Sequence, residues 1–188
     1  MAGIGHNQGP TMERGASWRR HCWRAARAEL LPQMPLNVVR RRVKRARELG
    51  LDYKTYASFR AATGRDIVAL LFSSNALRVV RTGDAVPEAR AAHMSATVRC
   101  DRRLVVQPPM GPEDLLERLK AQGLCLDSAV AAPRFDAPFA SVRAVMDAAR
   151  GRVPGDAVLL IGDTAIERSW CAAGRLAGFL PSERYFPS

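Results

Sequence analysis

Residues 40–65 read RRRVKRARELGLDYKTYASFRAATGR, and this stretch determines the fold expected for the first half of the chain. Across residues 36–49 the apolar side chains recur at steps of three and four, which is the spacing of one face of an α-helix. Gly50 suits the end of that helix, because glycine adopts the left-handed conformation without steric cost. Asp52 can then cap a second helix. The stretch therefore predicts two helices joined by a glycine turn.

Five residues of this stretch match those that pack two helices across a short turn: Ala46, Gly50, Leu51, Tyr56 and Phe59. In this pattern the stretch resembles the helix-turn-helix of bacterial DNA-binding proteins. The resemblance implies a recognition helix whose groove-facing residues are Tyr53, Lys54, Ala57, Ser58 and Ala61. Arg45 departs from the pattern, since that position is usually apolar. The alternative interpretation is an ordinary helical hairpin with a solvated charged face.

Positive charge is concentrated in the first part of the chain. The whole chain carries a net charge of +11; residues 1–75 contain 14 basic and 5 acidic residues, whereas residues 76–188 contain 15 and 13. This asymmetry favours a polyanionic partner, because each phosphate that a cation neutralises releases a condensed counterion. The expected phosphate contacts are Arg40, Arg41, Arg42, Lys44 and Arg47. The residues expected to face base edges are Tyr53, Lys54 and Ser58.

The rest of the first half is also predicted to be helical. Residues 1–16 are rich in glycine and polar residues and are expected to form a disordered tail. A capped helix is expected over residues 18–31, and the apolar residues 66–74 fit a third helix packed behind the hairpin. We therefore predict a basic helical domain of three to four helices over residues 17–80. The small and polar residues 81–96 are predicted to form a linker.

Residues 97–188 alternate strand and helix patterns. The continuous apolar run of residues 157–161 is typical of a parallel strand that is buried on both faces. The other expected elements are strands within residues 97–107 and 124–126 and helices over residues 112–122, 139–149 and 164–175. This alternation indicates a small α/β domain with a short, partly parallel sheet. The predicted fold class of the whole chain is α+β, with an N-terminal helical bundle before the α/β layer.

The run VLLIGDTAIERSWCAAGRLAGFL, residues 158–180, places Gly162 and Asp163 at the end of a predicted strand and Glu167 four residues later. In these features it resembles the last conserved motif of the haloacid dehalogenase superfamily of phosphatases. The resemblance implies that Asp163 and Glu167 help to hold Mg²⁺, for which carboxylate oxygen is a suitable ligand. The Asp-x-Asp-x-Thr motif that carries the nucleophile in that family does not occur in the sequence. The resemblance therefore implies a similar strand-to-helix shape near the end of the chain, and it does not imply phosphatase activity.

Simpler roles for these carboxylates stay open. Asp163 can be a turn or capping residue at a strand-to-helix junction, and Glu167 can be a surface charge in the first turn of the helix. His93 is the third ionisable group that an enzyme could use. It is expected to be solvated, because it lies in the predicted linker.

Composition narrows the class of protein. The sequence has no apolar run approaching the roughly twenty residues that a membrane span requires, and residues 1–10 lack the features of a secretory signal. We therefore expect a cytoplasmic protein without a membrane partner. The four cysteines are too widely spaced for a zinc site and are expected to be buried thiols: Cys22, Cys100, Cys125 and Cys171. No metal or other cofactor is expected.

The leading hypothesis is a nucleic-acid-binding protein, a DNA-associated or transcription-related factor without enzymatic activity. DNA is favoured over RNA as the partner, and the C-terminal domain is expected to mediate self-association or contact with another protein. Two alternatives stay open. One is a small metal-dependent enzyme that acts on a phosphorylated substrate at Asp163 and Glu167. The other is an assembly protein whose arginines bind an acidic partner.

Overall fold

The computed structural model describes residues 34–186 of the 188-residue chain. The predicted tail over residues 1–16 and the predicted helix over residues 18–31 lie outside these residues, as does Cys22. Within the described residues, no helix combines the length and the apolar character that crossing a membrane requires.

The chain divides into two units, residues 1–39 and residues 40–188. Of the first unit only residues 34–39 are described, and they contain the start of helix α2 (Leu36–Glu48). The sheet and both candidate sites discussed below belong to the second unit.

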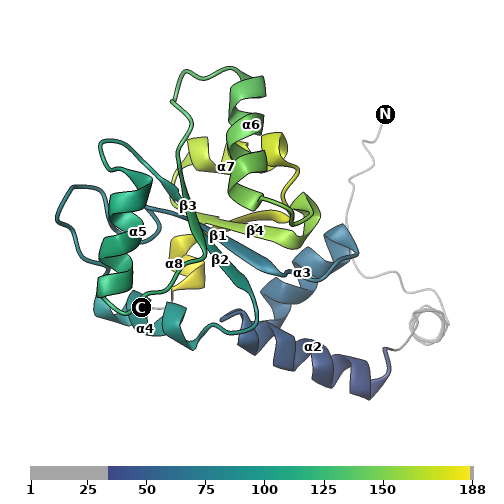
Figure 1. Ribbon diagram of the computed structural model, residues 1–188. Coiled ribbons are helices and arrows are strands. Elements are labelled where there is room, and N and C mark those ends of the chain that lie inside the picture. The colour runs from purple at the N-terminus through teal and green to yellow at the C-terminus, as the bar shows by residue number, and fades with distance from the viewer. Residues whose placement is uncertain (1–33, 187–188) are drawn as a thin grey trace, which may run out of the picture. The chain divides into compact units, whose positions relative to one another are not determined.

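The core of the second unit is a five-stranded sheet in which every strand pair is parallel. The strand order is β3-β2-β1-β4-β5, so the first strand in sequence lies at the centre (Figure 1). All five residues of β1 and of β4 are buried, as expected for strands covered on both faces. The strands are β1 Ala69–Ser73, β2 Asp101–Val106, β3 Ser128–Ala131, β4 Val158–Gly162 and β5 Gly178–Pro181.

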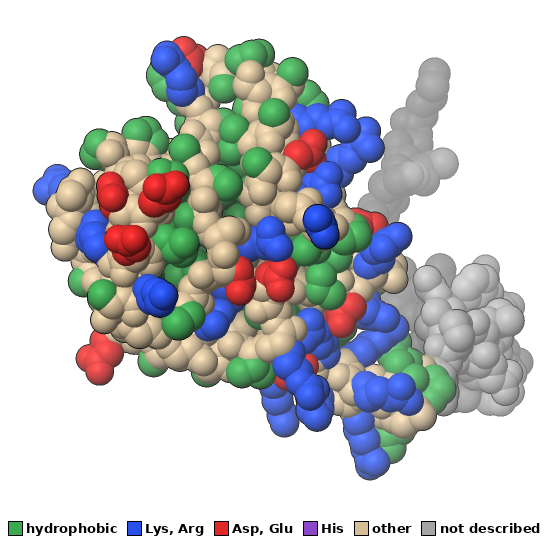
Figure 2. Space-filling view, viewed as in Figure 1, with side chains coloured by type: hydrophobic (Ala, Val, Ile, Leu, Met, Phe, Trp, Pro, Cys, Tyr) green, Lys and Arg blue, Asp and Glu red, His purple; other side chains and the backbone are tan. Residues whose placement is uncertain are grey.

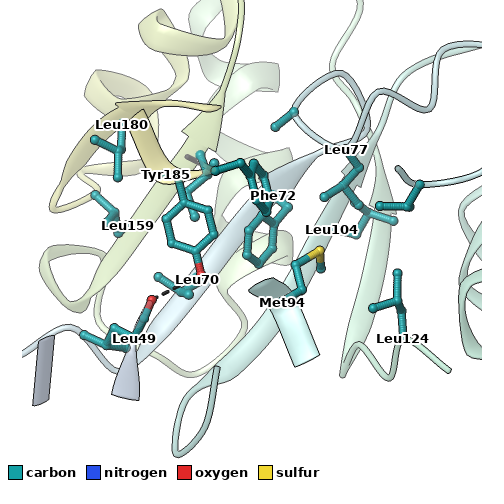
Figure 3. Close-up of a cluster of buried hydrophobic side chains, with 14 of the residues drawn as sticks. Leu49, Leu70, Phe72, Leu77, Met94, Leu104, Leu124, Leu159, Leu180 and Tyr185 are labelled. Carbon is teal, nitrogen blue, oxygen red and sulfur yellow. Dashed lines mark hydrogen bonds between the residues drawn. The ribbon is translucent and has the colours of Figure 1, made fainter. Parts of the chain in front are cut away.

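Helices cover both faces of the sheet. Successive residues of β1 alternate between two cores, because neighbouring side chains of a strand point to opposite faces. Leu70 and Phe72 join the core that α4, α5 and α8 cover (Figure 3), and Leu71 joins the core that α6 and α7 cover. After α2 the helices are α3 Tyr53–Thr63, α4 Glu88–Ala96, α5 Pro112–Ala121, α6 Phe139–Arg150, α7 Ala165–Gly174 and α8 Ser182–Tyr185, with a 3₁₀ turn over Gly155–Ala157.

The predicted α+β class with an N-terminal bundle of three to four helices is wrong. Residues 66–74, expected as the third helix, contain β1, and only α2 and α3 precede the sheet in the described part of the chain. A short apolar run suits a buried helix and a buried parallel strand equally, so its periodicity does not separate the two. The sheet is also entirely parallel instead of partly parallel. The fold is a doubly wound, Rossmann-like α/β fold.

Two further segments differ from their predictions. The linker expected over residues 81–96 contains α4, and Met94 of this helix is buried in the core. The strand expected at residues 124–126 is displaced, since β3 begins only at Ser128. In both segments the small and apolar residues gave too weak a pattern to fix the element.

His93 lies in α4 and is half-buried rather than solvated. Its Nε2 lies 3.0 Å from the carbonyl oxygen of Gly50, and its ring packs edge-on against Tyr185 and Phe186. Because that carbonyl can only accept, Nε2 carries the proton and donates it. Burial lowers the pKa of His93 below its ordinary value of 6.5, against the smaller opposing effect of the hydrogen bond.

Arg45 fastens α2 to the start of β1. Its guanidinium donates to the carbonyl oxygens of Ile67 at 2.7 Å and Arg99 at 3.0 Å. It also pairs with the carboxylates of Glu48 at 3.1 Å and Asp66 at 3.0 Å. The side chain is only 16% exposed. These contacts explain why this position holds an arginine where the helix-turn-helix pattern has an apolar residue.

Replacing Arg45 by alanine should lower the free energy of unfolding by about 2–3 kcal/mol, because two carboxylates and two carbonyl oxygens lose a common partner. Urea denaturation of parent and variant measures this difference. Arg47 is the control, since it is exposed on the same helix and has no ion pair among the described residues. Its change to alanine should alter the free energy by less than about 0.5 kcal/mol. Equal effects of the two changes would contradict the role given to Arg45.

The half-buried His93 should make stability depend on pH. The pKa of His93 in the folded chain lies below its value in the unfolded chain, so the unfolded state binds more protons as the pH falls below 6.5. The contribution is therefore complete above that pH and is lost on acidification. We predict that the free energy of unfolding falls less between about pH 7 and pH 5 in His93→Gln than in the parent. Urea titrations across this range test the difference, and a steeper fall in the variant would refute it.

Candidate functional site

The two helices and the glycine turn at the start of the second unit have local causes in the sequence. Gly50 has a φ of 68° and Gly64 a φ of 71°, so each ends a helix in the left-handed conformation that glycine tolerates. Asp52 caps α3, its Oδ1 accepting from the backbone N–H of Thr55 at 2.9 Å. Hydrogen bonds from Thr55 lower the pKa of Asp52.

Three of the six basic residues of α2 lie on one side of the helix. Arg40, Lys44 and Arg47 follow one another at steps of four and three, so their side chains leave the same face. We call these three residues the cationic stripe. They are all exposed, as is Arg41, whereas Arg42 is half-buried because it lies on the face of α2 that turns toward the core. Figure 2 shows basic side chains gathered over this helix.

The cationic stripe has no carboxylate partner among the described residues. The two carboxylates beside α2, Glu48 and Asp66, both pair with Arg45. Glu48 also lies 3.5 Å from Arg99, and Asp66 lies 3.9 Å from Arg60. Within residues 34–186, these acids therefore do not neutralise the charge of the stripe.

Helix α3 exposes the three residues that were predicted to face base edges, Tyr53, Lys54 and Ser58. The Ser58 hydroxyl donates to a carbonyl oxygen of its own helix at 2.8 Å. The other side of α3 packs on the edge strand β5, where the ring of Phe59 leaves no room for a Cβ at Gly178. The hairpin thus stands against the edge of a Rossmann-like sheet and not within a helical bundle.

A second candidate site lies at the carboxyl ends of β1 and β4. The chain leaves these neighbouring strands toward opposite edges of the sheet, since β1 is followed by β2 and β4 by β5. Ligands of open α/β sheets bind in the crevice that such a reversal creates. The residues that follow the strands here are Ser74 and Asn75 after β1, Gln107 after β2, and Asp163 and Thr164 after β4.

Glu167 occupies the base of this crevice and is fully buried. Its Oε2 accepts from the backbone N–H groups of Asp163 at 2.7 Å and Thr164 at 3.0 Å. Its Oε1 accepts from the side-chain amides of Asn75 at 2.9 Å and Gln107 at 3.4 Å. One carboxylate therefore ties the ends of β1 and β2 to the start of α7.

The alternative in which Glu167 is a surface charge is wrong, because the side chain has no exposed area. The missed signal is the spacing of Thr164 and Glu167. The Thr164 hydroxyl accepts from the backbone N–H of Glu167 at 3.1 Å, which completes a capping box with the carboxylate bond in the reverse direction. A threonine followed three residues later by glutamate is a recognised sequence signature of this cap.

The residues present do not fit the Mg²⁺ that the haloacid dehalogenase resemblance implies. All four acceptor contacts of Glu167 are taken by N–H donors, and Asp163 lies 3.5 Å from the guanidinium of Arg78. The adjacent strand end at β1 supplies Ser73, Ser74 and Asn75, none of which is a carboxylate. Across residues 34–186 no group of three or more histidines, cysteines or acidic residues could hold a metal.

Cys100 and Cys171 are not activated nucleophiles. Burial raises the pKa of Cys100 to about 11 and the pKa of Cys171 to about 12, so both remain thiols near neutral pH. Cys125 is exposed, contrary to the expectation of a buried thiol. His93 is half-buried beside Gly50 and does not line the crevice at the strand ends.

Comparison of the chain with protein-family models, with curated proteins and with solved structures finds no match. The geometry of the two candidate sites is therefore the basis for the proposed function.

Replacing Glu167 by glutamine should lower the free energy of unfolding by about 2–4 kcal/mol, since an amide N–H₂ would face N–H donors in the buried network. Glu183→Gln is the matched control, because its carboxylate is 81% exposed and should change stability by less than about 0.5 kcal/mol. Denaturant titration measures both variants. A Glu167→Gln variant as stable as the parent would show that the carboxylate is not a structural anchor.

Proposed function

We propose that the chain is a nucleic-acid-binding protein that holds the phosphate backbone of DNA through the cationic stripe of α2. The observation that carries this proposal is the exposure of Arg40, Lys44 and Arg47 on one helix face without a carboxylate partner among the described residues. Arg41 is exposed beside the stripe and can add a contact.

The spacing of the stripe supports this function. Arg40 and Arg47 are seven residues apart, which is about 10 Å along a helix axis. Like charges at neighbouring helical positions destabilise a helix by about 0.2–0.5 kcal/mol per pair. A stripe that keeps this repulsion in the folded chain gains most from a partner with closely spaced negative charges. Duplex DNA carries one such charge about every 1.7 Å of its axis.

Helix α3 is the element proposed to approach the bases. Its exposed residues Tyr53 and Lys54 can donate hydrogen bonds to base edges, and Lys54 can also contact a phosphate. Duplex DNA is the proposed partner because its major groove admits an α-helix, whereas the major groove of duplex RNA is too narrow. The α/β sheet would then serve self-association or contact with a protein partner.

The test is the binding of a labelled DNA duplex by fluorescence anisotropy across a salt series of about 50–200 mM. In the proposed complex the logarithm of the affinity falls with the logarithm of salt concentration, by about 0.9 for each phosphate contact. The triple variant Arg40→Ala, Lys44→Ala, Arg47→Ala should therefore show a slope that is shallower by about 2.7.

A second triple variant is the matched control for net charge: Arg81→Ala, Lys120→Ala, Arg152→Ala. These three cations are exposed and lie outside α2. The control should keep the slope of the parent chain within error. Absent or salt-independent binding by the parent would reject the proposal, and so would equal losses in the two triple variants. Competition by polyglutamate as strong as that by unlabelled duplex would favour an acidic protein partner instead.

A further inference from the structure

A pocket of about 270 Å³ opens beside Glu167 at the carboxyl ends of the strands. This volume is just below the range of about 300–1,000 Å³ found for small-molecule sites. The pocket lies where open α/β sheets bind ligands, between the loops that follow β1, β2 and β3 and the first turn of α7. Nothing in the proposed contact with nucleic acid uses these residues.

The walls of the pocket are apolar and exposed. Val80 is 52%, Phe135 85% and Ile166 50% exposed, and all three line it. They come from three separate segments of the chain: the loop after β1, the loop after β3 and the start of α7. Single exposed apolar side chains need no explanation, but their convergence on one concavity marks a surface that can bury an apolar ligand.

Two side-chain amides of the pocket each present an acceptor oxygen. Asn75 and Gln107 line it, and both direct their amide nitrogens at Glu167. A carboxylate only accepts, so this contact fixes the orientation of each amide and turns its oxygen away from Glu167. In the described part of the chain neither oxygen accepts a hydrogen bond. The single buried side-chain polar atom without a partner there is Arg103 Nε, so both oxygens are open to solvent.

Two of the backbone N–H groups that could hold an anion here are already bonded to a carboxylate. A helix N-terminus beside a crevice commonly holds a phosphate through its backbone N–H groups. Here the N–H groups before α7 donate to the Glu167 carboxylate, which brings its own negative charge to the base of the pocket. Arg78 at the same edge is paired with the carboxylates of Asp163 and Glu183.

We propose that this pocket binds a small ligand with a flat apolar body and N–H donors, neutral or cationic, and that it rejects phosphate. The apolar walls bury the body, and the oxygens of Asn75 and Gln107 accept from the donors. The Glu167 charge behind the two amides strengthens them as acceptors and repels anions.

The test is titration of the ¹⁵N-labelled full chain with two compounds of the same shape, 2-aminoquinoline, which has N–H donors, and quinoline, which has none. We expect 2-aminoquinoline to shift the side-chain amide signals of Asn75 and Gln107 and the backbone signal of Ile166. Quinoline should bind at least tenfold more weakly. Inorganic phosphate should leave these signals unchanged.

A matched pair of variants distinguishes binding of 2-aminoquinoline in the pocket from nonspecific binding to exposed apolar side chains. Ile166→Lys alters the wall, whereas Val98→Lys makes the same change at a residue that is equally exposed, 50%, and lies outside the pocket. Ile166→Lys should weaken 2-aminoquinoline at least tenfold and Val98→Lys less than twofold, with the amide spectrum verifying that both fold. The proposal is overturned by equal binding of the two compounds, by no binding, by phosphate-induced shifts at Asn75 and Gln107, or by equal effects of the two variants.

Discussion

The position of β1 between β2 and β4 is the constraint on which the rest of the structure depends. The strand is buried along its whole length, and its two ends are fixed by different charged groups. At the start, Arg45 of α2 binds the carbonyl oxygen of Ile67, and at the far end Asn75 donates to Glu167. Helix α2 is bound at the start of β1 and the crevice lies at its end, so the two candidate sites are at opposite ends of the sheet. The five-residue strand between them spans about 17 Å.

The same physical device operates at each end. At each end, one charged side chain forms ion pairs or hydrogen bonds with several neighbours. These bonds determine which polar groups of the neighbours remain exposed to solvent. Arg45 forms ion pairs with Glu48 and Asp66, so these two carboxylates do not pair with the cationic stripe of α2. Glu167 accepts hydrogen bonds from the amide nitrogens of Asn75 and Gln107, so the oxygens of both amides face the crevice. In both places an internal hydrogen-bond network therefore decides which polar groups face outward.

The sequence predicted the α2–α3 hairpin and the buried strand β4, because glycine caps and a continuous apolar run are strong local signals. It did not predict β1, because residues 66–74 are apolar almost all round and no period distinguishes a buried strand from a buried helix. The inward role of Arg45 and the burial of Glu167 depend on partners more than 20 and 90 residues away, Asp66 and Asn75. Local periodicity contains no information about such pairings. The capping box, in contrast, could be recognised in the sequence from the spacing of Thr164 and Glu167.

The central claim is that DNA is held at the α2 end of the sheet and not at the carboxyl ends of the strands. Titration of the ¹⁵N-labelled full chain with a short unlabelled duplex tests it most directly, because every backbone amide reports at once. The account predicts shifts over residues 40–58 of α2 and α3, with the amide signals of Asn75 and Gln107 unchanged. Shifts confined to the strand ends, or none in α2 and α3, would contradict it.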